Sequence, residues 1–287
     1  MAIGTSKISD LGSLYNLIYN DSLVTLYEEN VMVANGMVMT MQATGYAARK
    51  IGSWATATVQ TKPEGDDYAA PVVFSKSLTA TLTPAVAFAQ FLLTDEMVQT
   101  DSVDDVVSRA RTDLGAAMAD YVDDQLISDF ASFSGSIGSA GGTLTYGHVG
   151  AAIAQLRNAK IRGNTSVVLH PYQWHQIWKE LGRPAATYDF LGEAATEALR
   201  RYFVSNLLGA TWVTSANVSV DSSDDAVGGV FTQEALGYDE RESFNIEPER
   251  DASKRAIEYN ASLGFAHGVV RSTAGVKLTG DASTPTS

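Results

Sequence analysis

A single stretch, residues 101–130, most constrains what this chain can fold into. Its apolar side chains recur three or four positions apart, which predicts one buried stripe on an amphipathic helix; they are Val103, Val106, Val107, Ala110, Leu114, Met118, Tyr121, Val122, Leu126, Ile127 and Phe130. Polar residues at 100–102 can cap the first turn, and a Gly- and Ser-rich run at 132–142 ends the pattern. Such a helix is about 45 Å long. We therefore expect another long element to lie along it.

The composition is that of a folded protein with an ordinary core. The chain has 287 residues, of which 45% are hydrophobic and 18% charged, so it can form one large domain or two. Its formal net charge of -13 argues against a general affinity for nucleic acid, because phosphate binding depends on Lys and Arg. The absence of Cys excludes disulfides, thiolate nucleophiles and Cys-based zinc sites.

Neither end of the sequence carries a membrane or export pattern. No charged segment followed by an apolar one opens the chain, so we expect no secretion. The longest apolar runs, such as residues 84–93, are far shorter than the roughly twenty residues of a membrane-spanning helix. We expect a soluble protein with no membrane partner.

The first third of the chain predicts an arm followed by a hairpin. Residues 31–41 contain four methionines, which pack either on the chain's own domain or on something outside it; they are Met32, Met37, Met39 and Met41. Period-two alternation over residues 52–84, interrupted by turn residues at 62–67, predicts a long β-hairpin. A hairpin with so little bulk is marginal alone, so we expect it to rest on a neighbour.

The second half alternates helices and strands and then returns to strands. We expect a compact α/β lobe over about residues 146–232, with helices at 146–160, 172–181 and 193–208 and strands at 165–169, 210–214 and 227–231. His170 and Pro171 should end the strand at 165–169. The closing part predicts an exposed edge at 244–251, strands at 255–263 and 269–278, and a mobile polar tail at 281–287.

Motifs of common enzyme sites are absent from the sequence. It has no Gly-x-Ser-x-Gly elbow, no Gly-x-Gly-x-x-Gly turn and no phosphate-binding loop of the Gly-x-x-x-x-Gly-Lys type. The histidines are His148, His170, His175 and His267. His170 and His175 are five apart, which places them off a common helix face, so we expect His170 to end a strand and His175 to pack beside Trp174 and Trp178. We expect no catalytic, cofactor or metal site.

Acidic residues are frequent and unevenly distributed. Adjacent pairs occur at 66–67, 95–96, 104–105, 123–124 and 224–225, in turns or on the long helix, and we interpret them as solvated surface. Residues 95–129 contain ten acids against Arg109 and Arg111, which favours a basic surface nearby. The candidates are Arg241, Arg250, Lys254, Arg255 and Arg271.

The order of these parts resembles the major capsid proteins of tailed bacteriophages with the HK97-type fold. The residues that carry the resemblance are Leu82-Thr83-Pro84, Leu92-Leu93-Thr94-Asp95-Glu96 ahead of the helix, Val167-Val168-Leu169-His170-Pro171 in the lobe, and Gly264-Phe265-Ala266-His267-Gly268-Val269-Val270 near the end. The resemblance implies an α+β fold with an N-terminal arm at 1–45, an extended β-hairpin loop at 46–83, a peripheral domain at 84–145 with a spine helix at about 101–130, an α/β axial domain at 146–233, return strands of the peripheral domain at 234–280 and a flexible tail at 281–287.

The family also implies a function and partners. The implied role is that of a structural, non-enzymatic subunit that assembles into hexamers and pentamers of an icosahedral capsid around double-stranded DNA. The capsid belongs to the virion and is assembled in the host cytoplasm. The implied partners are a portal protein and in some cases a decoration protein. Because the chain begins close to the arm, we expect a separate scaffold protein. Some members crosslink a loop Lys to an Asn of a neighbour; Lys62 or Lys76 and Asn245 or Asn260 would be the groups, but no motif singles them out and we expect no crosslinking.

Two alternatives stay open from the sequence. One is a cellular nanocompartment shell of the same fold, which would enclose protein cargo. The other is a soluble α/β hydrolase or ligand-binding protein that uses the lobe at 146–232, which would need convergent polar groups in a pocket.

Overall fold

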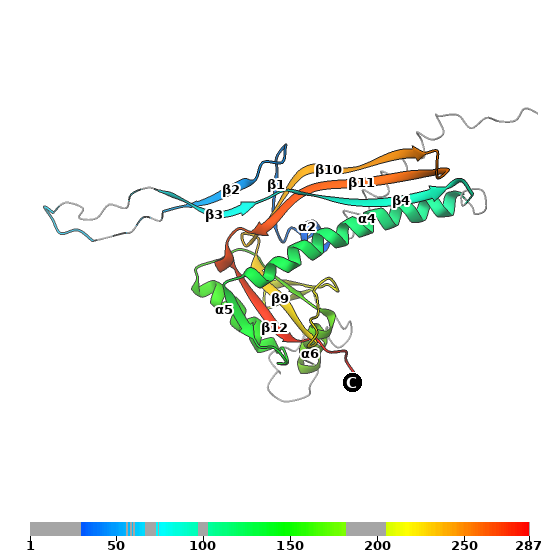
Figure 1. Cartoon of the computed structure of the whole chain (residues 1–287). Helices are drawn as coiled ribbons and strands as arrows, with labels where there is room; N and C mark the ends of the chain where they lie inside the picture. Colours follow the sequence, from blue (N-terminus) through cyan, green and yellow to red (C-terminus); the bar gives the residue numbers. More distant parts are fainter. Residues whose placement is uncertain are drawn as a thin grey trace, which may run out of the picture.

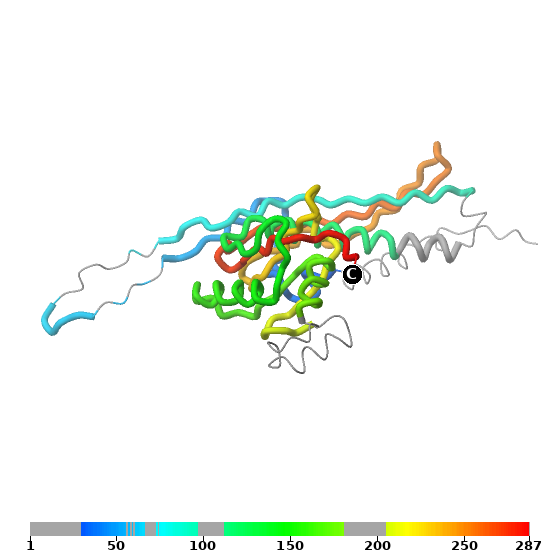
Figure 2. The backbone as a smooth tube through the Cα atoms, turned by 90° about the horizontal axis from the view of Figure 1, so that it is seen from below, coloured from blue at the N-terminus to red at the C-terminus, as the bar shows by residue number. Residues whose placement is uncertain are grey.

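The computed structural model divides into a long sheet, a projecting hairpin and a lobe. It describes residues 30–55, 57, 59, 61–66, 73, 75–96, 103–181 and 205–286, with the backbone alone at 103–111 and 181. Figure 1 shows the long helix α4 running beneath the sheet, the hairpin projecting from one end and the lobe hanging below. Seen from below in Figure 2, the hairpin and the far end of the sheet extend in opposite directions from the lobe.

The long sheet has four strands in the order β1-β10-β11-β4. Their bounds are Met39–Gln42 for β1, Leu236–Asp251 for β10, Ala256–Val269 for β11 and Ala85–Thr94 for β4. β10 and β11 form an antiparallel hairpin, β4 pairs antiparallel with β11 over its whole length, and β1 adds a short parallel edge. The sequence predicted the β11 alternation correctly, since Tyr259, Ala261 and Leu263 are buried. It missed β4, which was expected only to lead into the helix.

Helix α4 spans Val103–Ser128 and continues into a short 3-10 turn, η1, at Asp129–Ser132. The predicted stripe is confirmed over its described part: Leu114, Met118, Val122, Leu126, Ile127 and Phe130 are buried. Tyr121 is an exception, because it is 45% exposed and only its ring edge meets Phe265, at 6.1 Å between centroids. The stripe packs on β4 and β11, so these two strands are the long elements that the helix required.

The predicted hairpin is confirmed as a two-stranded sheet. β2 (Arg49–Trp54) and β3 (Lys76–Leu82) pair antiparallel, with Arg49 opposite Leu82 at the base. Residues 56, 58 and 60, on which part of the pattern rested, lie outside the described residues. Trp54 and Leu78 are more than half exposed, and within the described residues only Leu82 of these strands is buried. The described residues of the hairpin therefore form no second layer of their own.

The lobe is a six-stranded sheet, in the order β5-β12-β9-β6-β8-β7, with two helices. The strands are β5 (Gly135–Gly138), β6 (Thr165–Leu169), β7 (Asn206–Leu207), β8 (Ala210–Thr214), β9 (Asp225–Thr232) and β12 (Gly275–Asp281); the helices are α5 (Tyr146–Asn158) and α6 (Pro171–Leu181), and η3 (Ser272–Ala274) precedes β12. The predicted elements at 146–160, 165–169, 172–181, 210–214 and 227–231 are confirmed. Most of the helix predicted at 193–208 lies outside the described residues.

Two segments pair differently from the expectation. The Gly- and Ser-rich run contains β5, which pairs parallel with β12, and β12 pairs with β9 in the lobe instead of joining the long sheet. A pairing between residues so far apart has no local sequence pattern. The tail begins as structured chain, because Ala282 is buried and its N–H donates to the carbonyl of Asp224.

The methionine-containing segment packs on the chain's own core. α2 (Val31–Ala34) lies against α4, and Met32 and Met37 are fully or almost fully buried. The reading in which this segment packs within its own domain is therefore confirmed for these two residues.

The stripe of α4 can be tested with one pair of variants. Leu114→Asp places an unpaired carboxylate in the core and should lower the free energy of unfolding by several kcal/mol. Ala117→Asp makes the same charge change on the exposed side of the same helix and should cost less than about 1 kcal/mol. Denaturant unfolding of the unassembled subunit measures both; equal losses would contradict the assignment of the stripe.

Candidate interaction surfaces

The histidines have structural positions. His148 completes a capping box at the start of α5, and His170 lies at the end of β6, where its Nδ1 accepts from the N–H of Tyr172. Burial lowers the pKa of His170 from its usual value. His175 stacks on Trp178 at 5.5 Å, in line with the expectation. His267 contacts Asp129 at 2.9 Å, which joins β11 to the end of α4.

The described residues contain no group of three metal-ligating side chains. None of the helices in the described part of the chain is long and apolar enough to span a bilayer.

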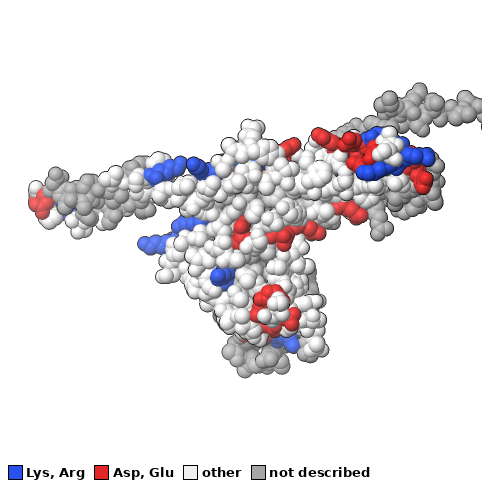
Figure 3. All heavy atoms as spheres, viewed as in Figure 1, with Lys and Arg blue, Asp and Glu red and all other residues white. Residues whose placement is uncertain are grey.

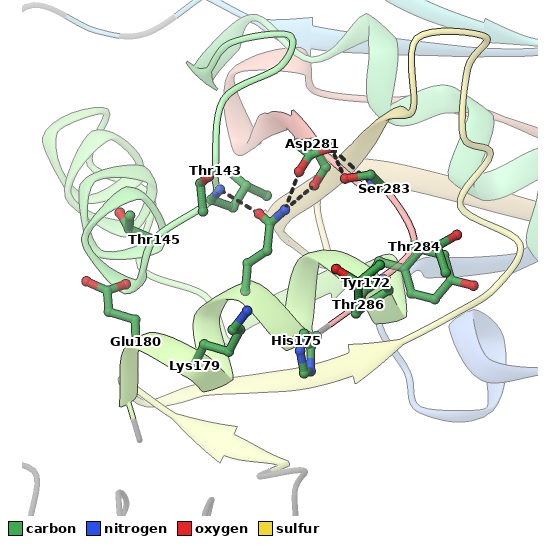
Figure 4. A pocket seen from close by; sticks show the side chains of 13 residues that line it. Thr143, Thr145, Tyr172, His175, Lys179, Glu180, Asp281, Ser283, Thr284 and Thr286 are labelled. Atoms are coloured by element: carbon green, nitrogen blue, oxygen red, sulfur yellow. Dashed lines mark hydrogen bonds between the residues drawn. The ribbon is translucent and has the colours of Figure 1, made fainter. Parts of the chain in front are cut away.

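A polar cavity of about 470 Å³ lies in the lobe between α6 and the residues after β12 (Figure 4). Gln176 extends across it: its amide donates to the carbonyl and the carboxylate of Asp281 and accepts from the N–H of Leu144. Ser283 also donates to Asp281, and these bonds hold the pKa of Asp281 below its usual value. The polar groups thus bind one another, which fixes residues 281–283 onto α6.

The expectation that the acidic pairs form solvated surface is wrong at two positions, Asp123 and Asp225, which are buried. Asp95 lies at the surface, where it forms a bidentate ion pair with Arg250, at 2.6 and 2.7 Å, which lowers the pKa of Asp95. Asp225 is buried and accepts from the N–H of Gly141 at 2.6 Å. Asp123 is buried on α4. Asp124, its neighbour in sequence, is exposed as expected.

Asp123 attaches the segment before β1 to the long helix. Its two carboxylate oxygens accept from the N–H groups of Val31 and Met32, at 2.7 and 3.0 Å, where α2 begins. Those N–H groups have no acceptor inside the helix, so the carboxylate oxygens supply the acceptors that the first turn of α2 lacks. Burial raises the pKa of Asp123 to about 6, while the two N–H groups act in the opposite direction and the nearby Asp120 raises it further.

The basic candidates bind acids of the same chain. Arg250 and Arg255 reach Asp95, which directly follows β4, so part of the predicted pairing with the acidic stretch is confirmed. Lys254 contacts Asp251 and Glu258, and Arg271 contacts Glu234. Arg241 lies beside Asp239, a buried acid that the sequence patterns did not single out.

Among the described residues, no helix or strand covers the face of the long sheet turned away from α4. On β4 the side chains alternate, so that Ala87 and Leu93 are buried, whereas Val86, Phe88 and Leu92 are exposed, Phe88 by 64%. Strand β4 is also an edge of the sheet. Residues directly opposite in an antiparallel pair share a face, so this apolar row lies beside a polar one on β11 formed by Glu258, Asn260 and Ser262.

Charge is separated between this face and the hairpin. Glu247 and Glu249 on β10 extend the polar row with exposed acids, through their pairing with Asn260 and Glu258. Figure 3 shows Lys and Arg on the part of the hairpin nearest the body and Asp or Glu at its tip. The basic residues exposed on the hairpin strands are Lys50 and Lys76, and Lys76 lies 5.6 Å from the centre of the Trp54 ring.

Comparison with known proteins identifies the fold. A structure from Mycobacterium phage Che8 matches with a TM-score of 0.65 and 19% identity, over 82% of this chain and 85% of that chain. The capsid of cyanophage P-SCSP1u matches at 0.68 with 14% identity, over 86% and 87%. A virus-like particle from Pyrococcus furiosus matches at 0.57 with 10% identity, over 92% and 99%. The chain therefore has the α+β fold of HK97-type capsid proteins, as the sequence predicted.

The family follows from a sequence model. The model described as phage capsid protein matches residues 81–278, which is well over half of the chain. The chain belongs to the phage capsid protein family, and its role is that of a structural subunit in a capsid shell. No curated protein sequence matches it.

The buried carboxylate of Asp123 predicts a dependence of stability on pH. Its pKa in the folded chain, about 6, lies above the ordinary 3.8, so the folded state holds this proton more tightly. Its contribution to the free energy of unfolding should therefore fall as pH rises from about 4 to about 6 and stay constant above that. Asp123→Asn should remove that slope, up to about 1.4 kcal/mol per pH unit.

Asp124→Asn is the matched control, since Asp124 is exposed on the same helix. Urea unfolding of the unassembled subunit between pH 4 and 8 measures the three proteins. Parallel curves for the wild type and Asp123→Asn would show that Asp123 is not the titrating group.

Proposed function

We propose that the chain is the major subunit of an icosahedral capsid, assembled in the host cytoplasm as hexamers and pentamers and enclosing double-stranded DNA. A portal, a separate scaffold protein and in some cases a decoration protein are its partners, and it performs no catalysis. One observation carries the proposal. A chain of the capsid family has both a two-stranded hairpin and an apolar sheet face that the described residues leave exposed.

The regions divide as the family resemblance implies, with one amendment from the strand pairing. Residues 1–45 act as the N-terminal arm, 46–83 as the extended loop, 84–134 and 234–271 as the peripheral domain, and the remainder up to residue 280 as the axial domain. The amendment moves β5 and β12 to the axial domain, because both pair within the lobe sheet.

The hairpin and the sheet face are complementary halves of one contact. The hairpin exposes Trp54 and Leu78 together with Lys50 and Lys76, whereas the face exposes the β4 apolar row beside the acids of β10. An edge strand with an exposed apolar row can bind another chain, and a two-stranded hairpin without a second layer is marginally stable until it packs on one. A second copy of this chain supplies both.

A contact between two different surfaces of the same chain leads to rings. Each copy gives its hairpin to one neighbour and receives the hairpin of another, which is a heterologous contact. Such contacts close into a ring when the rotation between copies is a simple fraction of a turn. Five- and sixfold rings fit this scheme, and the shell needs no strong basic surface, in keeping with the net charge of -13.

The alternative with a specific observation is a nanocompartment shell around protein cargo. The match to the virus-like particle from Pyrococcus furiosus, covered over 99% of that chain, shows that the fold also occurs in a virus-like particle. A soluble hydrolase that uses the lobe has less support, because the cavity there is lined by groups that bind one another.

Electron microscopy of the chain expressed with the neighbouring genes of its source tests the proposal. We expect closed icosahedral particles that contain nuclease-protected double-stranded DNA. After boiling in detergent, this chain should run at 30.6 kDa without a ladder of crosslinked multiples above it. Particles filled with protein and free of DNA would support the nanocompartment instead. A monomer that forms no particles under any of these conditions would overturn both.

Substitution of the apolar row tests the contact itself. The triple variant Val86→Ser, Phe88→Ser and Leu92→Ser removes exposed apolar area from β4, so the subunit should fold but assemble at least tenfold less, as measured by sedimentation of particles. Val220→Ser changes a similarly exposed apolar residue of the lobe and should assemble normally. Raised salt should weaken wild-type assembly, because the charges are exposed. Normal particles from the triple variant would exclude this face as the contact.

A further inference from the structure

The hairpin is attached to the long sheet at its first residue pair. Leu82 and Arg49 lie opposite each other at the base of β3 and β2. Leu82 is 1% exposed and sits over Gly237 and Gly268, which face each other across β10 and β11. A Cβ atom would lie 3.2 Å from a methyl group of Leu82 if added at Gly237, and 2.9 Å if added at Gly268. The Leu82 side chain therefore occupies space that side chains at these two positions would fill.

The opposite strand is attached by charge. Arg49 donates from Nε and Nη2 to the two carboxylate oxygens of Asp239 on β10, at 2.7 and 3.1 Å. Nη2 of Arg241 lies 2.6 Å from the same carboxylate. The Asp239 side chain is fully buried and that of Arg241 nearly so, whereas the Arg49 side chain is 30% exposed.

The same two arginines hold the segment that joins β1 to the hairpin. Arg49 donates to the carbonyl of Gln42 at 3.1 Å, and Arg241 donates to the carbonyl of Gly45 at 3.0 Å. The hydroxyl of Tyr46 donates to Glu242, also on β10. The connector is therefore tied to β10 at Gly45 and Tyr46, and to the base of β2 at Gln42.

The three charged groups have unequal roles. Asp239 and Arg241 both belong to β10 and form a buried ion pair that remains when Arg49 is lost. Removal of Asp239 would leave two cations without their anion, which is strongly destabilising in a buried site. Arg49 is the member that belongs to the hairpin, so its loss should affect how the hairpin is held more than how the sheet folds.

A single contact leaves the hairpin free to turn. If Leu82 alone held the base, both strands could pivot about that side chain. A second contact on the other strand, about 5 Å away, removes this rotation. A bidentate Arg–carboxylate pair is suited to this, because its two parallel hydrogen bonds also fix orientation.

We propose that Arg49 and Asp239 are positioning residues that set the direction in which the hairpin projects and so aim it at the next copy of the chain. This inference rests on the proposed function, in which the hairpin contacts a second copy. The Leu82 side chain fixes the position of the hairpin base, and the Arg49–Asp239 ion pair prevents rotation about that side chain.

The cysteine-free chain allows a direct measurement. Spin labels on Thr79→Cys, exposed on β3, and Ala151→Cys, exposed on α5, report the distance from the hairpin to the lobe in the unassembled full chain. Pulsed electron spin resonance should give one narrow distance distribution for the otherwise wild-type protein. Arg49→Met, which keeps an apolar stem, should at least double the width of that distribution.

Lys76→Met is the matched control, since it removes one cation from the same hairpin away from the base. It should leave the distribution as in the wild type, and Arg49→Lys should lie between, because a Lys makes a single contact where Arg makes two. Melting of the labelled proteins should differ by no more than about 2 °C. An unchanged width in Arg49→Met, or a loss of its folded structure, would overturn the proposal.

Assembly is a separate readout. Arg49→Met should require at least a tenfold higher concentration than the wild type to form particles, since a hairpin without a fixed direction must be ordered on contact. Failure of the wild type to form particles would overturn the proposed function, while the label distances would still decide whether Arg49 holds the hairpin. Equal assembly of Arg49→Met and the wild type would overturn the role of this ion pair in reaching the next copy.

Discussion

The packing of one face of α4 against β4 and β11 is the contact on which the rest of this structure depends. The helix has 26 residues and is about 39 Å long, and the 14 residues of β11 span about 46 Å, so rod and sheet match in length. Other parts attach to this unit at its ends. Asp123 holds α2, and Phe130 meets Phe231 of the lobe at 5.2 Å. Each attachment is local, whereas the helix–sheet contact runs along the long sheet (Figure 1).

A sheet covered by one helix layer keeps a second face, and this explains why the subunit is incomplete alone. On β4, Ala87 and Leu93 are buried on the side of α4, whereas Val86, Phe88 and Leu92 on the other side are exposed although they are apolar too. The hairpin has the same deficit, with two strands and no layer to cover them. In the proposed assembly, one contact between copies covers both the sheet face and the hairpin, so the surfaces that the monomer leaves exposed favour a shell.

The sequence predicted the elements whose burial is periodic and local. The α4 stripe, α5 and β6 follow from their own residues and were placed within a few positions. Strand β4 was missed because apolar residues such as Ala87 and Phe88 fill both of its faces, which hides the alternation that marks a strand. Asp123 lies four residues from the buried Ala119 and Ile127 on α4, but no local pattern reveals that α2 supplies the N–H groups that its carboxylate accepts from. The pairing of β5 with β12 depends on residues about 140 positions apart and has no local pattern.

The chain shares its fold with solved structures at only 10 to 19% identity. The packing of the long helix and the direction of the hairpin place different demands on the sequence. A long amphipathic helix beneath a sheet needs only the right spacing of apolar residues, which many sequences satisfy. The direction of a projecting hairpin is different, because two strands without a core can leave the body at many angles. A buried Asp239 between two arginines has to be desolvated, so it adds little net stability for its size. Such a cluster fixes one direction of the hairpin relative to the long sheet. In the proposed assembly the subunit depends on this direction, because its hairpin must meet the neighbouring copy at a fixed angle.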